Sequence, residues 1–262
     1  MRLAWLTDIH LNFVRSELRR QFYSAIEQGQ PDAVLIGGDI AEAPDVVECL
    51  HEIESAIDKP IYFVLGNHDF YRSSIADVSA RVSSVATPNL VWLTGSGVQL
   101  LNDSIALIGD DGWADGRLGN YAASTLFLND FLLIGEFAEL NKAERLVLLN
   151  ELADAAAARI RTKLHEACSV RPRVILLTHV PPFHEATWHE GRTSDDDWLP
   201  HFGSKVMGDT IIEVMDQYPQ CRVEVLCGHT HGAGLVQIRP NVIAKTGGAV
   251  YGKPVVQGVL EV

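Results

Sequence analysis

The chain has 262 residues, of which 47% are hydrophobic, so it can bury a substantial core as one large domain or two small ones. Its formal net charge of −13 excludes general electrostatic binding of nucleic acid or anionic lipid, and acidic residues within the most apolar stretch, residues 122–140, argue against a membrane span. The four cysteines are too few and too far apart for a disulfide framework, which favours reduced thiols and a cytoplasmic location.

Short apolar runs alternate with amphipathic segments in the first third of the chain. The helix expected over residues 16–28 places Leu18, Phe22 and Ile26 on one face. In chain order we predict a strand at 3–7, a helix at 16–28, a strand at 33–36, a helix at 44–57, a strand at 61–65 and a helix at 73–84. This alternation indicates parallel β-α-β units in a sheet with both faces covered.

Strands dominate the rest of the sequence, apart from two helices. We predict strands at 91–93, 98–101, 105–108, 174–178 and 223–227, and helices at 141–167 and 205–217. Residues 109–116 and 181–203 are predicted to be loops, and the tail, at 235–238, 242–245 and 255–262, a β meander. No stretch has the composition of a linker, so residues 1–262 are expected to form a single domain.

Polar side chains that can bind a metal follow five of the predicted strands. The sequences at these strand ends are Asp8-Ile9-His10, Gly37-Gly38-Asp39, Gly66-Asn67-His68-Asp69, Thr178-His179 and Gly228-His229-Thr230-His231. Because the carboxyl ends of parallel strands line one crevice, we expect these groups to converge there. Asp8 and His10 are two residues apart, as are His229 and His231, so each pair can face the same cavity.

The donor types and the order of the motifs both point to a metal site. Carboxylate, carboxamide and imidazole donors without thiolate suit manganese, iron or zinc ions rather than a structural zinc site. The motifs from Asp8 to His231 resemble those of the calcineurin-like metallophosphoesterases. They are, in order, DxH, GD, GNHD, a lone histidine and GHTH. The resemblance implies an α/β fold, a four-layer α/β/β/α sandwich. It also implies two metal sites that share Asp39: one with Asp8, His10, Asp39 and His231, the other with Asp39, Asn67, His179 and His229.

The expected activity is hydrolysis of phosphate esters with two divalent metal ions. Two such ions about 3.5–4 Å apart hold a phosphoryl group and lower the pKa of a bridging water, so that hydroxide can attack phosphorus. His68 is the residue expected to stabilise the phosphoryl oxygens or to protonate the leaving group, a role that the resemblance supports. An acidic side chain would orient its ring: Glu42, three residues after Asp39, is favoured over Asp69, which could instead cap the backbone.

Departures from the family's best-known branches narrow the expected substrate. The protein serine/threonine phosphatases carry arginine where this chain has Ala43 and read GNHE rather than GNHD, which argues against a phosphoprotein substrate. The lipid-precursor hydrolase branch has arginine in place of His68. We therefore expect a small phosphate ester, with a phosphodiesterase acting on nucleotides or other small diesters as the alternative to a phosphomonoesterase. An inactive metal-binding scaffold is the alternative from another class, and it predicts a missing ligand or a missing His68.

Substrate specificity is expected in two loops, residues 109–121 and 181–203. His184, His189 and His201 are either solvated loop residues or substrate contacts, and Trp113 either belongs to a turn or stacks on the substrate. The apolar segment 126–137 is expected in the core or at an oligomer surface, so an oligomer is compatible with the sequence.

Overall fold

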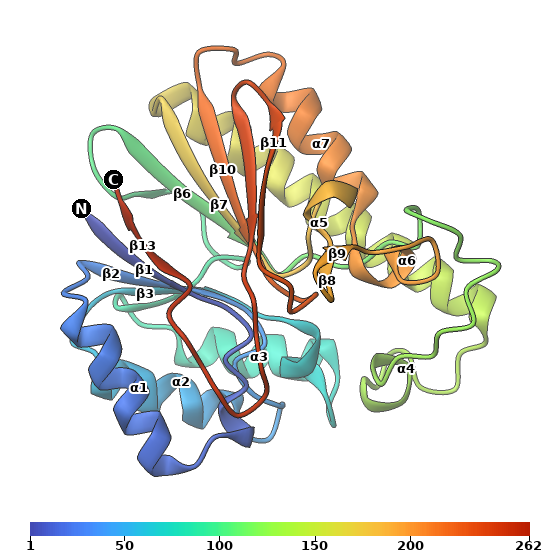
Figure 1. The fold of residues 1–262 in the computed structure, drawn as a ribbon, viewed down its shortest axis with the longest axis horizontal. Coiled ribbons are helices and arrows are strands. Elements are labelled where there is room, and N and C mark those ends of the chain that lie inside the picture. Colours follow the sequence, from blue (N-terminus) through green and yellow to red (C-terminus); the bar gives the residue numbers. More distant parts are fainter.

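Two β-sheets pack face to face in a computed structural model that describes residues 1–262 (Figure 1). The first is five-stranded, in the spatial order β13 (Gly258–Glu261), β1 (Arg2–Leu6), β2 (Ala33–Gly37), β3 (Ile61–Val64) and β4 (Leu90–Trp92). The second is six-stranded, in the order β11 (Gly234–Arg239), β12 (Val242–Thr246), β10 (Arg222–Cys227), β7 (Arg173–Thr178), β6 (Ile105–Asp110) and β5 (Gln99–Leu100). Strands β1 to β4 are parallel to one another, and so are β6, β7, β10 and β12.

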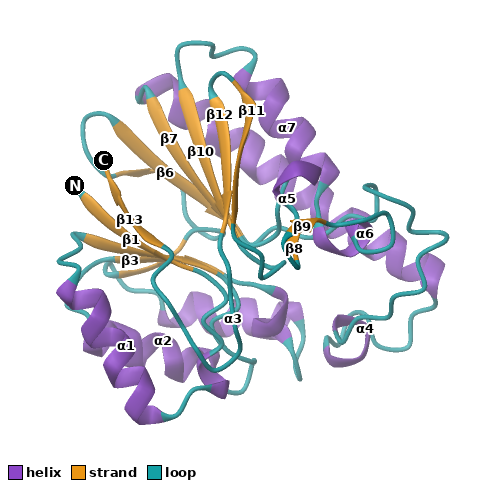
Figure 2. Cartoon of the chain, viewed as in Figure 1, coloured by secondary structure: helices purple, strands orange, loops and turns teal.

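Helices cover the outer face of each sheet (Figure 2). The first sheet carries α1 (Ser16–Gln28), α2 (Val46–Ala56) and α3 (Ile75–Val85), and the second carries α5 (Lys142–Val170) and α7 (Lys205–Met215). The layers therefore run helix, sheet, sheet, helix, which confirms the predicted four-layer α/β/β/α sandwich. None of the helices combines the length and the apolar character that crossing a membrane requires.

The central strands are buried on both faces, which explains their continuous apolar sequences. In β1, Leu3 and Trp5 pack into the cluster between the two sheets, whereas Ala4 and Leu6 pack beneath the helices. All five residues of β2 are buried as well. A parallel sheet covered on both sides selects such runs instead of an alternation of apolar and polar residues, so the sequence predicted these strands at close to their observed positions.

The predicted C-terminal β meander is wrong. Of the three tail strands, β11 and β12 pair with each other, antiparallel, and β12 also lies parallel to β10. The last strand, β13, belongs to the first sheet, where it pairs antiparallel with β1 (Figure 1). Apolar patterning reports which face of a strand is buried and says nothing about which strand pairs with it, so this pairing was not predictable from the tail alone.

The predicted loop at 181–203 contains short regular elements. A two-stranded hairpin joins β8 (Trp188–His189) to β9 (Arg192–Thr193), and α6 (Leu199–Phe202) follows. A further short helix, α4 (Asp130–Leu133), lies in the apolar stretch that precedes α5. These four elements, each of two to four residues, are too short to show a periodic pattern, and the sequence did not predict them.

The parallel strands of the two sheets converge at their carboxyl ends and diverge at their amino ends (Figure 2). At the converging end, the backbone N–H of His229, after β10, donates to the carboxylate of Asp8, after β1. The imidazole of His179, after β7, lies beside the Gly37 carbonyl at the end of β2. The fold therefore brings the five motif-bearing strand ends to one edge.

Candidate metal centre

Five of the residues predicted as metal ligands have a left-handed backbone. The φ angles are 51° for Asp8, 41° for His10, 51° for Asp39, 68° for His229 and 59° for His231. This conformation costs an L-residue roughly 1–2 kcal/mol, and residues held in it gather at functional sites. Asp8, Asp39 and His229 lie two residues beyond a strand end, and His10 and His231 lie four residues beyond one, so the turns of the backbone occur where the strands stop.

Asp8, His10, Asp39 and His231 form a compact group of donors. One ligand atom from each lies within 4.8 Å of the others. His231 Nε2 is 3.4 Å from Asp8 Oδ1 and 3.2 Å from His10 Nε2, and His10 Nε2 is 3.7 Å from Asp39 Oδ2. Two carboxylates and two imidazoles at this spacing match the donors that manganese, iron or zinc ions take.

Asn67, His179 and His229 form a second group beside the first, and Asp39 faces both. Asn67 Oδ1 is 3.1 Å from His179 Nε2 and 3.0 Å from His229 Nδ1. Asp39 Oδ1 is 3.4 Å from His179 Nε2, while its other oxygen faces His10. The structure therefore brings all seven predicted ligands together and places Asp39 between the two groups.

Hydrogen bonds on the outer side of the second group orient its donors. His179 Nδ1 donates to the Gly37 carbonyl over 2.8 Å, and His229 Nε2 donates to the His201 carbonyl over 3.0 Å. Because a carbonyl only accepts, the hydrogen of each ring lies on this outer nitrogen and the inner nitrogen keeps its lone pair. Asn67 Nδ2 donates to Asp130 Oδ1 over 2.8 Å, which turns the amide oxygen inward. These orientations fit a metal ion.

The charges of the buried groups also fit a cation. Asp8 and Asp39 are 3% and 1% exposed. Burial alone would raise the pKa of Asp39, but His179, His68 and His10 lower it below its usual value. Burial lowers the pKa of His10 to about 4, against the opposing effect of Asp39 and Asp8, so the ring is neutral at pH 7. Two buried carboxylates beside a neutral imidazole call for a positive partner.

Comparison with known proteins identifies the family of this chain. Residues 1–233 match the calcineurin-like phosphoesterase family. The chain belongs to this family. No curated protein sequence gives a significant match. Among solved structures, phosphopantetheinyl hydrolase from Mycobacterium tuberculosis is similar with a TM-score of 0.69 and 14% identity, over 96% of this chain and 90% of that one. A dimetal phosphatase from Danio rerio is similar with a TM-score of 0.61 and 14% identity, over 96% of this chain and 88% of that one. At these identities the likeness shows the shared fold.

His68 of this calcineurin-like phosphoesterase lies at the edge of the ligand groups. Its Nε2 is 4.0 Å from Asp39 Oδ2 and 3.5 Å from the Tyr251 hydroxyl. The ring stacks on Tyr71 at a centroid distance of 4.2 Å, and Nδ1 has no hydrogen-bond partner. With its side chain 16% exposed, His68 is accessible to a molecule that enters the site.

The acids predicted to orient His68 have other partners, so this prediction is corrected. Glu42 Oε2 accepts a hydrogen bond from Arg72 Nε over 2.6 Å. Asp69 is fully buried and accepts from three backbone N–H groups, those of Ile40, Ala41 and Gly66. Asp69 therefore ties the loop after β2 to the loop after β3, the backbone role that was the alternative for it. Neither acid forms a hydrogen bond or an ion pair with His68, whose Nε2 lies nearest to Asp39 and Tyr251.

A cleft of about 300 Å³ opens over the ligand groups, and we call it the substrate cleft. It is lined by Asp39, Asn67, His68, Tyr71, Leu128, Asn129, Asp130, His189, Phe202, His229, Thr230, His231 and Tyr251. Phe202 belongs to the predicted specificity loop 181–203, although it was not singled out. Asp130 and Tyr251 were not predicted, since each lies outside the motifs and the two loops. Burial and the neighbouring Asp130 carboxylate raise the pKa of Tyr71, so its hydroxyl stays protonated and donates to Asp130 over 2.5 Å.

The two predicted specificity loops contribute unequally to the substrate cleft. His189 lines it, whereas the ring of His201 is buried and lies 3.1 Å from the Ser124 hydroxyl. Trp113 is 7% exposed and packs against Phe70 and Phe137 at centroid distances of 5.6 and 5.9 Å. Trp113 is therefore part of the core and does not stack on a substrate.

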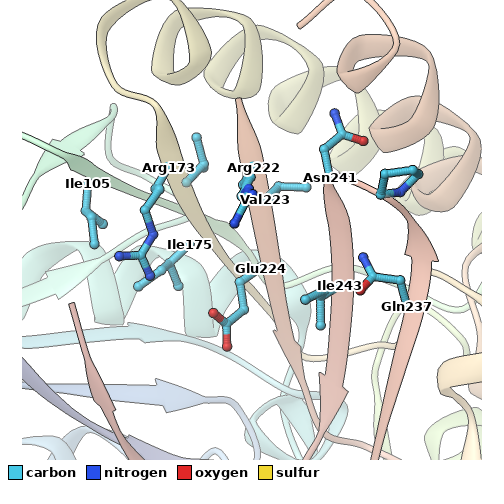
Figure 3. Close-up of a pocket in the computed structure, with 11 residues that line it drawn as sticks. Ile105, Arg173, Ile175, Arg222, Val223, Glu224, Gln237, Asn241 and Ile243 are labelled. Carbon is cyan, nitrogen blue, oxygen red and sulfur yellow. The ribbon is translucent and has the colours of Figure 1, made fainter. Parts of the chain in front are cut away.

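A second hollow, of about 310 Å³, lies at the opposite, diverging end of the second sheet (Figure 3). Arg173 and Arg222, the first residues of β7 and β10, line it together with Glu224 and Gln237. It contains none of the predicted site residues. All the predicted metal-binding motifs lie at the other, carboxyl ends of the strands, where the substrate cleft opens.

Proposed function

We propose that this protein hydrolyses small phosphate esters with two divalent metal ions, manganese, iron or zinc. Asp8, His10, Asp39 and His231 would hold one ion, and Asp39, Asn67, His179 and His229 the other. The observation that carries the proposal is Asp39, which directs one oxygen to each group of donors. When bound, the ions would polarise the phosphoryl oxygens and make a water more acidic.

The protein's own side chains would position the ester and handle the proton. His68 is accessible from the cleft and lies beside Asp39, so its ring can reach the leaving oxygen of a bound ester. His68 would deliver a proton to that oxygen as its bond to phosphorus breaks. The outer hydrogen bonds of His179, His229 and Asn67 hold their donor atoms facing inward, so little rearrangement is needed when the ions and the ester bind.

The inactive scaffold remains the rival, and His68 separates it from an enzyme. With manganese supplied, His68→Ala is expected to keep its metal content and to lose turnover of a p-nitrophenyl phosphate ester by about 100-fold or more. The matched control is His51→Ala, a half-exposed histidine on α2, whose activity should equal that of the unchanged protein.

Metal content by elemental analysis and turnover by absorbance are the two measurements. A purified protein that takes up no metal would contradict the ligand assignment. Full metal occupancy without turnover of any phosphate ester would favour the scaffold. We also propose a cytoplasmic location, which the four unpaired cysteines support.

A further inference from the structure

The substrate cleft contains no lysine or arginine. Its charged lining groups are Asp39, one of the proposed ligands, and Asp130, which accepts hydrogen bonds from Asn67 and Tyr71 and forms no ion pair. Two cationic residues lie close in the sequence to residues that line the cleft, but neither supplies a free positive charge to it. Arg72 is paired with Glu42, and Lys253 is an exposed residue outside the lining of the cleft.

This charge balance distinguishes the two classes of phosphate ester. A phosphomonoester carries a charge of about −1.5 to −2 at pH 7, whereas a diester has lost that second ionisable oxygen and keeps one charge. Two divalent ions would bring four positive charges, and the carboxylates of Asp8, Asp39 and Asp130 offset three of them. Neither lysine nor arginine lines the cleft to balance a second negative charge on the substrate.

Aromatic side chains stand on both sides of the ligand groups, and we call them the two aromatic walls. On one side the Tyr251 ring lies 4.5 Å from the His10 ring and 5.1 Å from the His231 ring. On the other side the Phe202 ring lies 5.4 Å from the His229 ring. Tyr251 is half exposed, so it presents a free face. A diester has an organic group on each side of phosphorus. Tyr251 offers one of these groups an apolar face, and Phe202, which is 8% exposed, offers the other the small part of its ring that lines the cleft.

Building on the proposed function, we infer that the substrate cleft selects phosphodiesters over phosphomonoesters, with the two ester arms lying against Tyr251 and Phe202. In the reaction, the oxygen of water bonds to phosphorus and the bond from phosphorus to one ester oxygen breaks, with the electron pair leaving on that oxygen. One hydrogen of water reaches the leaving oxygen through His68, and the other is released from the new phosphate. The products are an alcohol and a phosphomonoester, whose extra charge favours its release.

Three aryl esters with the same leaving group test the selectivity. They are bis(p-nitrophenyl) phosphate, methyl p-nitrophenyl phosphate and p-nitrophenyl phosphate, assayed with the manganese-loaded protein. We expect kcat/KM for the diesters to exceed that for the monoester by about tenfold or more. Hydrolysis of the monoester at an equal or higher kcat/KM would overturn the inference and leave the proposed function standing. Absence of hydrolysis with all three would instead overturn the proposed function.

Two substitutions test the two features separately. Asp130→Asn keeps a hydrogen-bond acceptor but removes the charge, and it should raise the kcat/KM of the monoester relative to the diester by about tenfold. Asp103→Asn, at an exposed turn before β6, is the matched control and should leave this ratio unchanged.

Tyr251→Ala should raise KM for the bis-aryl diester more than for the methyl aryl diester, and Tyr251→Phe should restore it. Unchanged ratios in Asp130→Asn or in Tyr251→Ala would refute the role given to that residue.

A binding measurement gives a readout that does not depend on turnover. His68→Ala loaded with manganese should bind bis(p-nitrophenyl) phosphate more tightly than p-nitrophenyl phosphate in calorimetric titrations. Equal affinities, or tighter binding of the monoester, would contradict selection by charge and by the two walls.

Discussion

At the scale of single residues, the candidate metal centre depends on side chains that orient its donors. Asp130 is the clearest case, because it accepts hydrogen bonds from both Asn67 Nδ2 and the Tyr71 hydroxyl. A carboxamide can present either its oxygen or its nitrogen, and only the oxygen binds a metal ion. Asp130 therefore decides which atom of Asn67 faces His179 and His229.

Removal of the Asp130 side chain should weaken metal binding. In Asp130→Ala the Asn67 amide nitrogen loses its shorter hydrogen bond and keeps only the one to the Tyr71 hydroxyl at 3.3 Å. Affinity for the manganese ion of the second group should therefore fall by about 10- to 100-fold. Titration with manganese, followed by calorimetry, measures this change. Asp103→Ala serves as the control, and an affinity equal to that of the unchanged protein would show that Asn67 is oriented by its neighbours alone.

At the scale of elements, hydrogen bonds to the backbone fix two of the motif loops and the start of the long helix α5. Asp69 joins the loops after β2 and β3 through three hydrogen bonds from backbone N–H groups. The long helix α5 begins at a capping box: Asn141 Oδ1 accepts from the N–H groups of Ala143 and Glu144, and the Glu144 side chain accepts from the N–H of Asn141. Asp69 acts beside the proposed ligands, whereas the capping box of α5 lies at an exposed helix start.

Loss of this cap should lower stability without affecting the site. Asn141→Ala leaves two N–H groups at the start of α5 without their acceptor, and the free energy of unfolding should decrease by about 1 kcal/mol. Urea denaturation monitored by circular dichroism measures the difference, and Asn141→Asp, which can still accept both bonds, should recover most of it. A drop in manganese affinity in Asn141→Ala would show that the cap of α5 also influences the candidate metal centre.

At the scale of the whole molecule, the candidate metal centre joins the two sheets. Asp8, Asp39 and Asn67 follow strands of the first sheet, whereas His179, His229 and His231 follow strands of the second. Without a cation the two buried carboxylates, which both follow strands of the first sheet, would have only imidazoles beside them. Bound ions would therefore contribute to the stability of the fold as well as to its chemistry.

Removal of metal should accordingly destabilise the protein. A ligand at 100 times its Kd adds about 2.7 kcal/mol to the free energy of unfolding, so chelation should lower the Tm by several degrees and added manganese should restore it. Differential scanning calorimetry of the chelated and reloaded protein measures the shift. The Asp39→Asn variant, which loses a shared ligand, should respond much less, and an equal shift in both proteins would place the stabilising metal elsewhere.

Sequence alone determined the central strands, the helices that cover them and the seven proposed ligands. Both faces of β1 and β2 are buried, so their apolar runs are local signals, and the ligands follow strand ends at short, regular spacings. Tertiary structure alone decided the rest. Three features depend on segments that are distant in the chain. They are the pairing of Glu42 with Arg72 rather than His68, the sheet that β13 joins, and the presence of Asp130, Phe202 and Tyr251 in the lining of the cleft. Patterning encodes the burial of a residue but not its partner, because a partner is chosen only when the whole chain packs.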